Sequence, residues 1–227
     1  MYPLDGAYEQ INGAREHLHN LKPEIDDFRK VIANKVSLQY KKGIVNIKGK
    51  QLNVPIGTAT APFNHPTPPR ASRLIGEVIQ SLRKALDYLV YELARFDSKS
   101  IIEKTQFVIV DSEENFRENK RHLKGLSGEH IAMFERLQPY NGCNWTKLLR
   151  DLSNPDKHKT LTAIRHFTGI SLNTSNTEAI LAGQKMNVDS YATIQITFYN
   201  GSPVIESLEQ LMLDVTQTLR LFDCEFK

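Results

Sequence analysis

Apolar residues recur at three- and four-residue steps over much of the chain, as they do along amphipathic helices. The strongest pattern runs over 72–96, where Leu, Ile, Val and Phe fall within one wide arc of a helical wheel. A stripe of this width is typical of the central helix of a bundle. Weaker stripes predict further core helices over 5–33, 145–167 and 204–222. Pro23 is expected to kink or split the first of them, and Pro155 to divide the third.

Three segments have the composition of β-strands. Residues 36–52 predict a small hairpin with its turn near Lys41–Gly43, and 105–110 predicts a short strand. The alternating β-branched run at 191–199 predicts a third strand, while the proline-rich stretch 55–70 predicts an extended connector. We therefore expect an α+β fold over residues 1–227 as a single domain, mainly a helical bundle with a small β-sheet from these three segments.

Composition narrows the class of protein without naming its partner. The 227 residues are 40% apolar and 24% charged, which is typical of a folded globular chain. A net charge of +3 is too small to identify a nucleic-acid partner. The two cysteines form no CxxC pair, so a reducing compartment is expected and a structural zinc site is not. The polar start and the absence of an 18-residue apolar run predict a cytoplasmic protein without a membrane partner.

The segment from Leu148 to Lys159 carries the densest candidate chemistry. Asn154 is a favoured N-cap and Pro155 suits the first helical position, which would put Asp156 and His158 in the first turn of a helix. The positive end of the helix dipole disfavours the protonated form of an imidazole at that place. His158 would then be neutral, as a general base requires.

A second candidate pair lies on the long central helix. Arg83 and Asp87 are four residues apart and fall just beyond the edge of the apolar stripe. They form either an ion pair on the rim of the core or part of a polar cleft between helices. Metalloprotease, P-loop, hydrolase-elbow and dinucleotide-binding motifs are missing from the sequence, and we expect no cofactor and no metal site.

Residues 74–89, which include the run Leu82-Arg83-Lys84-Ala85-Leu86-Asp87, resemble the LRxALD helix of a family of uncharacterised bacterial proteins. The likeness continues through 105–109, 125–127 and 138–140 and ends in 154–159, which looks like that family's NxDKHR motif. This chain has Lys159 where the family usually has arginine and Ser81 where it often has asparagine.

The bundle with Arg and His on a core helix is also similar to HEPN domains, many of which cut RNA with an Arg-x(4–6)-His motif. Arg150 and His158 have seven residues between them, one more than that motif allows. Arg117 and His122 have the HEPN spacing but lie on a short, highly charged segment. The resemblance implies an RNA-directed, metal-independent nuclease.

Three hypotheses for the candidate site remain open. In the first, Asp156 and His158 serve only to stabilise a helix start. In the second, His158 is a general acid or base, Arg150 or Lys157 stabilises charge on a phosphate, and Arg83 with Asp87 forms a second polar layer. In the third, residues 142–166, which carry five Lys and Arg against two Asp, bind a nucleotide or nucleic acid without chemistry.

For the third hypothesis Trp145 would stack on bases, and the binding set is Arg83, Asp87, Trp145, Asn154, Asp156 and Lys159. The partners implied are RNA, a nucleotide, a protein partner or a second copy of the chain. An RNA assay with excess chelator separates the nuclease from a non-enzymatic helical module.

Overall fold

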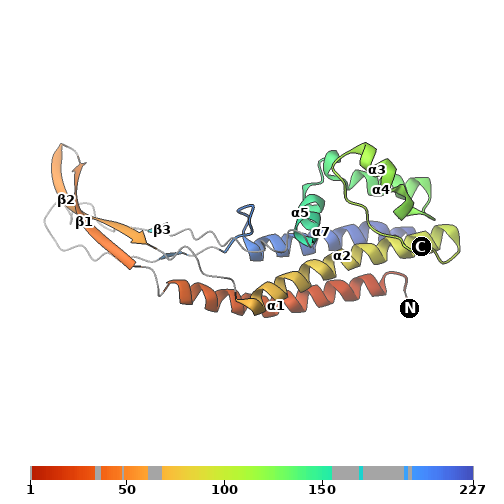
Figure 1. Ribbon diagram of the computed structural model, residues 1–227, viewed down its shortest axis with the longest axis horizontal. Coiled ribbons are helices and arrows are strands. Elements are labelled where there is room, and N and C mark those ends of the chain that lie inside the picture. The colour runs from red at the N-terminus through yellow and green to blue at the C-terminus, as the bar shows by residue number, and fades with distance from the viewer. Residues whose placement is uncertain are drawn as a thin grey trace.

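The structure is a computed structural model that describes residues 2–33, 37–47, 49–60, 68–154, 169–170, 192–193 and 196–226. Three long helices lie side by side along the molecule: α1 (Asp5–Ala33), α2 (Pro69–Ser98) and α7 (Val204–Asp223) (Figure 1). Each of them packs against the other two, as the apolar pattern predicts. Both chain ends lie at the same end of this bundle (Figure 1).

Helix α2 is the central element because its apolar stripe is buried along its whole length. Leu82, Leu86 and Leu89 have no exposed surface, and Pro69 starts the helix where a missing N–H costs nothing. The helix ends at Lys99, whose left-handed backbone closes it. Helix α1 continues as one helix through Pro23, so of the two expected effects of this proline, a kink or a split, the split is wrong.

Short helices cover one side of α2 and α7. They are α3 (Glu113–Asn119), η1 (Lys120–Leu123), α4 (Gly128–Arg136), η2 (Pro139–Asn141) and α5 (Asn144–Ser153), and η4 (Cys224–Phe226) follows α7. Ser112 and Ser127 cap α3 and α4 by accepting backbone N–H groups with their hydroxyls. Phe134 joins this layer to the bundle, stacked on Phe222 at 4.7 Å and edge-on to Phe107 at 5.4 Å.

The predicted α+β class is wrong, because the described part is mainly helical and the three strand-like segments share no sheet. Strands β1 (Ser37–Ile47) and β2 (Lys50–Thr60) pair only with each other, as do β3 (Gly169–Ile170) and β4 (Ala192–Thr193). Residues 105–110 are extended without a partner strand. Of 191–199, only β4 and an isolated bridge from Thr197 to Pro203 have β character in the described part.

The boundaries of the first hairpin also differ from those expected. Ile47 pairs with Lys50, so the chain reverses between these two residues, and Gly49 there has a positive φ of 81°. Lys42 lies within β1 opposite Pro55, which places the start of the predicted connector inside β2. The predicted helix over 155–167 lies outside the described residues, and the prediction of a single domain stays a prediction.

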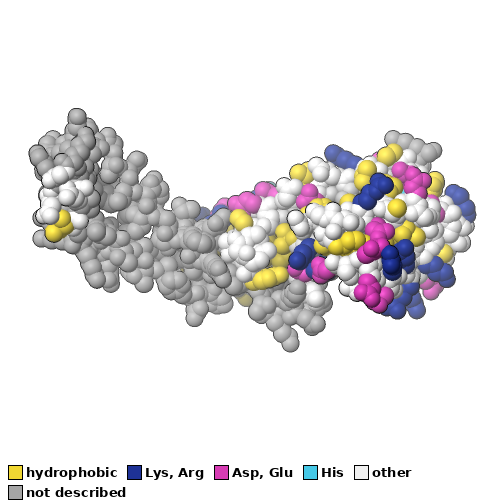
Figure 2. Space-filling view, turned by 90° about the horizontal axis from the view of Figure 1, so that it is seen from above, with side chains coloured by type: hydrophobic (Ala, Val, Ile, Leu, Met, Phe, Trp, Pro, Cys, Tyr) yellow, Lys and Arg dark blue, Asp and Glu magenta, His cyan; other side chains and the backbone are white. Residues whose placement is uncertain are grey.

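The described surface carries mixed charge. Lys and Arg side chains alternate with Asp and Glu over the helical part of the face drawn in Figure 2, and they do not separate into fields of one sign. None of the described helices combines the length and the apolar character that a membrane span requires.

Candidate functional site

Arg150 is the one predicted catalytic residue within the described part of the chain. Its Nη1 lies 2.8 Å from Asp111 Oδ2 and its Nη2 lies 3.1 Å from Asp151 Oδ1. Two carboxylates therefore balance its positive charge, which leaves little to attract a phosphate. His158 and Lys157, the other two predicted catalytic residues, lie outside the described residues, as do Asp156 and Lys159.

Trp145 and Asn154, two of the predicted binding residues, both take part in the fold: one packs against the core and the other ends a helix. Trp145 is partly buried and packs against the hydrophobic core, so its ring is not a free platform for a base. Asn154 ends α5 in an extended conformation. Whether residues 142–166 bind a nucleic acid stays a prediction, because most of the lysines counted there follow Asn154.

Arg83 and Asp87 hold the backbone of Phe107 and do not primarily bind each other. Asp87 Oδ1 accepts the N–H of Phe107 at 2.8 Å, and Arg83 Nη2 donates to the carbonyl oxygen of Phe107. The two side chains are 3.9 Å apart. Burial raises the pKa of Asp87, and the positive charge of Arg83 and the Phe107 hydrogen bond oppose that rise.

Gln138 also attaches the extended segment 105–110 to the helices. Its buried amide donates to the Val108 carbonyl oxygen at 2.8 Å and accepts the N–H of Val110 at 2.9 Å. Together with Arg83 and Asp87 it supplies the hydrogen bonds that a neighbouring strand would otherwise provide. The chain from Lys99 to Thr105 is thereby drawn back along α2.

A hollow of about 500 Å³ lies between α2 and this returning segment. We call it the tyrosine hollow, and its main lining residues are Lys84, Tyr88, Tyr91, Ile101, Ile102 and Lys104. The volume lies within the usual range for small-molecule sites. The Tyr88 ring lies close to Gly6 of α1 and remains 44% exposed. It is therefore supported on one side and open on another.

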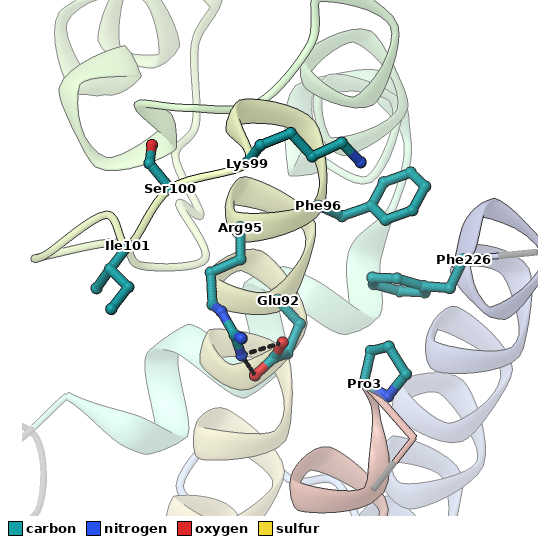
Figure 3. A pocket seen from close by; sticks show the side chains of 8 residues that line it. All are labelled: Pro3, Glu92, Arg95, Phe96, Lys99, Ser100, Ile101 and Phe226. Carbon is teal, nitrogen blue, oxygen red and sulfur yellow. Dashed lines mark hydrogen bonds and ion pairs between the residues drawn. The ribbon is translucent and has the colours of Figure 1, made fainter.

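A second hollow, of about 370 Å³, lies at the end of α2 (Figure 3). We call it the phenylalanine hollow, lined chiefly by Pro3, Arg95, Phe96, Lys99, Ile101 and Phe226. Phe96 and Phe226 meet edge-to-face at 5.4 Å. Lys99 Nζ lies 4.2 Å from the centre of the Phe96 ring, and Arg95 is paired with Glu92 at 2.9 Å (Figure 3). Ile101, which is 76% exposed, belongs to both hollows.

Two tyrosine rings lie between cations along the α2 face that borders the two hollows. The side chains on this face are Lys84, Tyr88, Tyr91 and Arg95, followed by Lys99 at the C-cap. Their spacing of three or four residues places them on one line along the helix. The Arg95 guanidinium lies 5.7 Å from the centre of the Tyr91 ring. This line, which we call the α2 stripe, could have been found from the polar side of the 72–96 pattern.

Two lysines at the hollows have an unfavourable backbone. Lys99 has a φ of 55° and Lys104 a φ of 63°, and these are the non-glycine residues with positive φ in the described part. A side chain other than glycine in this region costs on the order of 1–2 kcal/mol. Both positions thus hold a lysine where glycine would fit the backbone better.

A histidine between two carboxylates fixes the C-terminal turn beside the phenylalanine hollow. His130 Nδ1 lies 2.6 Å from Asp97 Oδ2, which also accepts the N–H of Ser127 at 2.7 Å. His130 Nε2 lies 3.5 Å from Glu225 Oε2. The Glu225 contact is attractive only while the imidazole is protonated, since a neutral ring that donates from Nδ1 has a lone pair on Nε2. These contacts join α2, α4 and η4.

Scans of the chain against protein-family models, curated proteins and solved structures found no match. The resemblance to a bacterial family and to HEPN domains therefore stays a prediction. What the two hollows can bind is therefore inferred from the residues that line them.

Proposed function

We propose that the chain is a non-enzymatic helical module that binds single-stranded nucleic acid along the α2 stripe, with the tyrosine hollow as its principal site. The observation that carries this proposal is a line of cations and two tyrosine rings, Tyr88 exposed and Tyr91 half-buried, beside a hollow of about 500 Å³. Proteins that bind single strands without sequence preference combine such cations, which follow the phosphates, with rings on which bases stack.

Tyr88 and Tyr91 are the residues on which bases would stack. The ring of Tyr88 lies against Gly6 and loses little freedom when a base covers its exposed side. Lys84 and Lys104 line the same hollow, within reach of a phosphate attached to a stacked base. Stacking on an aromatic side chain contributes about 1–3 kcal/mol per base.

The carboxylates of the hollow limit the affinity without excluding an anion. Asp87 is already engaged by the Phe107 N–H and faces Arg83, and Glu103 also lines the hollow. Lys84 and Lys104 balance these two acids. Stacking would therefore contribute more of the affinity than charge, and binding is expected to be weak and tolerant of sequence.

Fluorescence anisotropy with labelled 12-nucleotide oligo(U) RNA and oligo(dT) DNA, at low salt, tests the proposal and separates the two sources of a single strand. Tyr88→Ala and Tyr91→Ala should each weaken binding by about tenfold. Tyr199→Ala is the matched control, because Tyr199 is 38% exposed and lies outside both hollows. If wild-type protein binds neither the RNA nor the DNA, the proposal is wrong. The α2 stripe would then be a candidate surface for a protein partner.

The same reactions test the nuclease hypothesis. A metal-independent nuclease that acts through His158 would shorten the RNA in excess chelator, and His158→Ala would not. We expect the RNA to stay intact with both proteins.

A further inference from the structure

We infer that the phenylalanine hollow is a second nucleotide subsite, which takes the base next along the strand from the one in the tyrosine hollow. This inference rests on the proposed function. It adds where along α2 the second base of the nucleic acid binds. Each hollow combines two aromatic rings with two cations: Tyr88 and Tyr91 with two lysines in one, and the Phe96–Phe226 pair with Arg95 and Lys99 in the other.

The spacing of the hollows fits two neighbouring bases that do not stack on each other. Tyr88 and Phe96 are eight residues apart on α2, which corresponds to about 12 Å along the helix axis. Ile101 lines both hollows and has most of its side chain exposed. A strand lying along α2 would therefore have its two bases separated by this side chain.

The cations at the second hollow are placed for the phosphate between the two bases. Arg95 lies over Tyr91 of the first hollow and also lines the second, so its guanidinium is at the junction. Lys99 Nζ covers the face of Phe96. A base that stacks on Phe96 takes the place of the ammonium group, which then pairs with the phosphate.

The far wall of the second hollow is the C-terminal turn. The turn that carries Phe226 is held by the Tyr2 hydroxyl, which donates to the carbonyl oxygen of Asp223 at 3.0 Å, and Glu225 lies 3.5 Å from His130. Pro3 lines the same wall beside Phe226 (Figure 3). The subsite thus requires residues from both ends of the chain in contact.

The test compares uridine monophosphate with 5′-phosphorylated UpU, each titrated into the full chain and followed by NMR chemical shifts. Wild-type protein should bind the dinucleotide about tenfold more tightly than the mononucleotide. Phe226→Ala should remove this difference while leaving mononucleotide binding at the tyrosine hollow unchanged. Leu221→Ala is the matched control, because Leu221 is an exposed residue on α7 outside both hollows. It should behave as wild type.

The two proposals fail in different ways. If wild-type protein binds both ligands equally, or if Phe226→Ala weakens both equally, the second subsite is wrong while the tyrosine hollow stands. If neither ligand nor the longer strands bind, both proposals are wrong. Should Phe226→Ala fail to fold, Lys99→Gln at an exposed position replaces it, and it should lower dinucleotide affinity alone.

Discussion

At the scale of single residues, Asp87 has a structural role that can be measured. Phe107 is fully buried, and its N–H has Asp87 as its hydrogen-bond partner. Asp87→Ala leaves that N–H unsatisfied, so we expect a loss of about 1–3 kcal/mol in the free energy of unfolding by urea. Asp27→Ala is the control, because within the described residues that exposed carboxylate pairs with Lys30. Its loss should cost less than about 0.5 kcal/mol.

Asp87 should also make stability depend on pH. Burial raises the pKa of its carboxyl above the unfolded value, so the folded state binds this proton more tightly. The resulting stabilisation is complete below the unfolded pKa, near 3.9, and is lost as pH rises through the folded pKa. The unfolding free energy of wild type relative to Asp87→Asn should therefore decrease from about pH 4 upward. An increase over that range would contradict the assigned shift.

Lys99 and Lys104, whose backbones are left-handed, should lower the stability of the fold and strengthen nucleic-acid binding. Lys99→Gly and Lys104→Gly relieve an unfavourable φ, so each should raise the free energy of unfolding by on the order of 1 kcal/mol. Each also removes a cation from a hollow and should weaken nucleic-acid binding. Lys124→Gly, where φ is −57°, is the control and should lower stability without changing affinity. Unchanged affinity in both hollow variants would leave the two lysines without a role in binding.

At the scale of elements, α2 should be the main source of stability. Leu82 and Leu86 are fully buried, and their helix packs against α1, α7 and α5. Leu82→Ala and Leu86→Ala should each lower the free energy of unfolding by about 2–5 kcal/mol, as cavity-forming changes do. Gln80→Ala on the exposed side of the same helix should have almost no effect. Thermal or chemical denaturation of the three variants decides this.

The three long helices of the described part were predictable because their signal is local. The stripe over 72–96 depends on residues within a few turns of one another, and α2 and α7 follow the expected ranges closely. Residues 105–110 have the same apolar and β-branched composition as a strand, but their backbone groups bind the side chains of Arg83, Asp87 and Gln138. Sequence pattern alone does not reveal such distant partners.

The candidate site was less predictable than the fold. Lys84, Tyr88, Tyr91 and Arg95 share one face at helical spacing, and this part could have been derived from the sequence. The hollows themselves form only when 99–105 turns back along α2. Gly125 contributes to that packing, since a Cβ there would lie 2.7 Å from Ile102. Contacts of this kind join residues far apart in the chain.

At the scale of the whole molecule, mixed surface charge should keep the salt dependence of binding small. The net charge is +3 and the face in Figure 2 carries both signs. Of the four cations at the hollows, Arg95 divides its charge between Glu92 and a phosphate, so the four together correspond to about three phosphate contacts. The logarithm of affinity should fall with the logarithm of salt concentration with a slope of about −2. A slope near zero in an anisotropy titration would speak against phosphate contacts.

The meeting of the two chain ends has a consequence for how the protein folds during synthesis. Helices α1 and α2 can pair as soon as Ser98 has left the ribosome, but α7 closes the core only after Asp223. At ordinary translation rates this interval lasts on the order of 10 s. Throughout it, the apolar surface that Leu208 and Leu219 later cover lies open to other molecules. A nascent chain halted between these points should therefore aggregate or recruit chaperones.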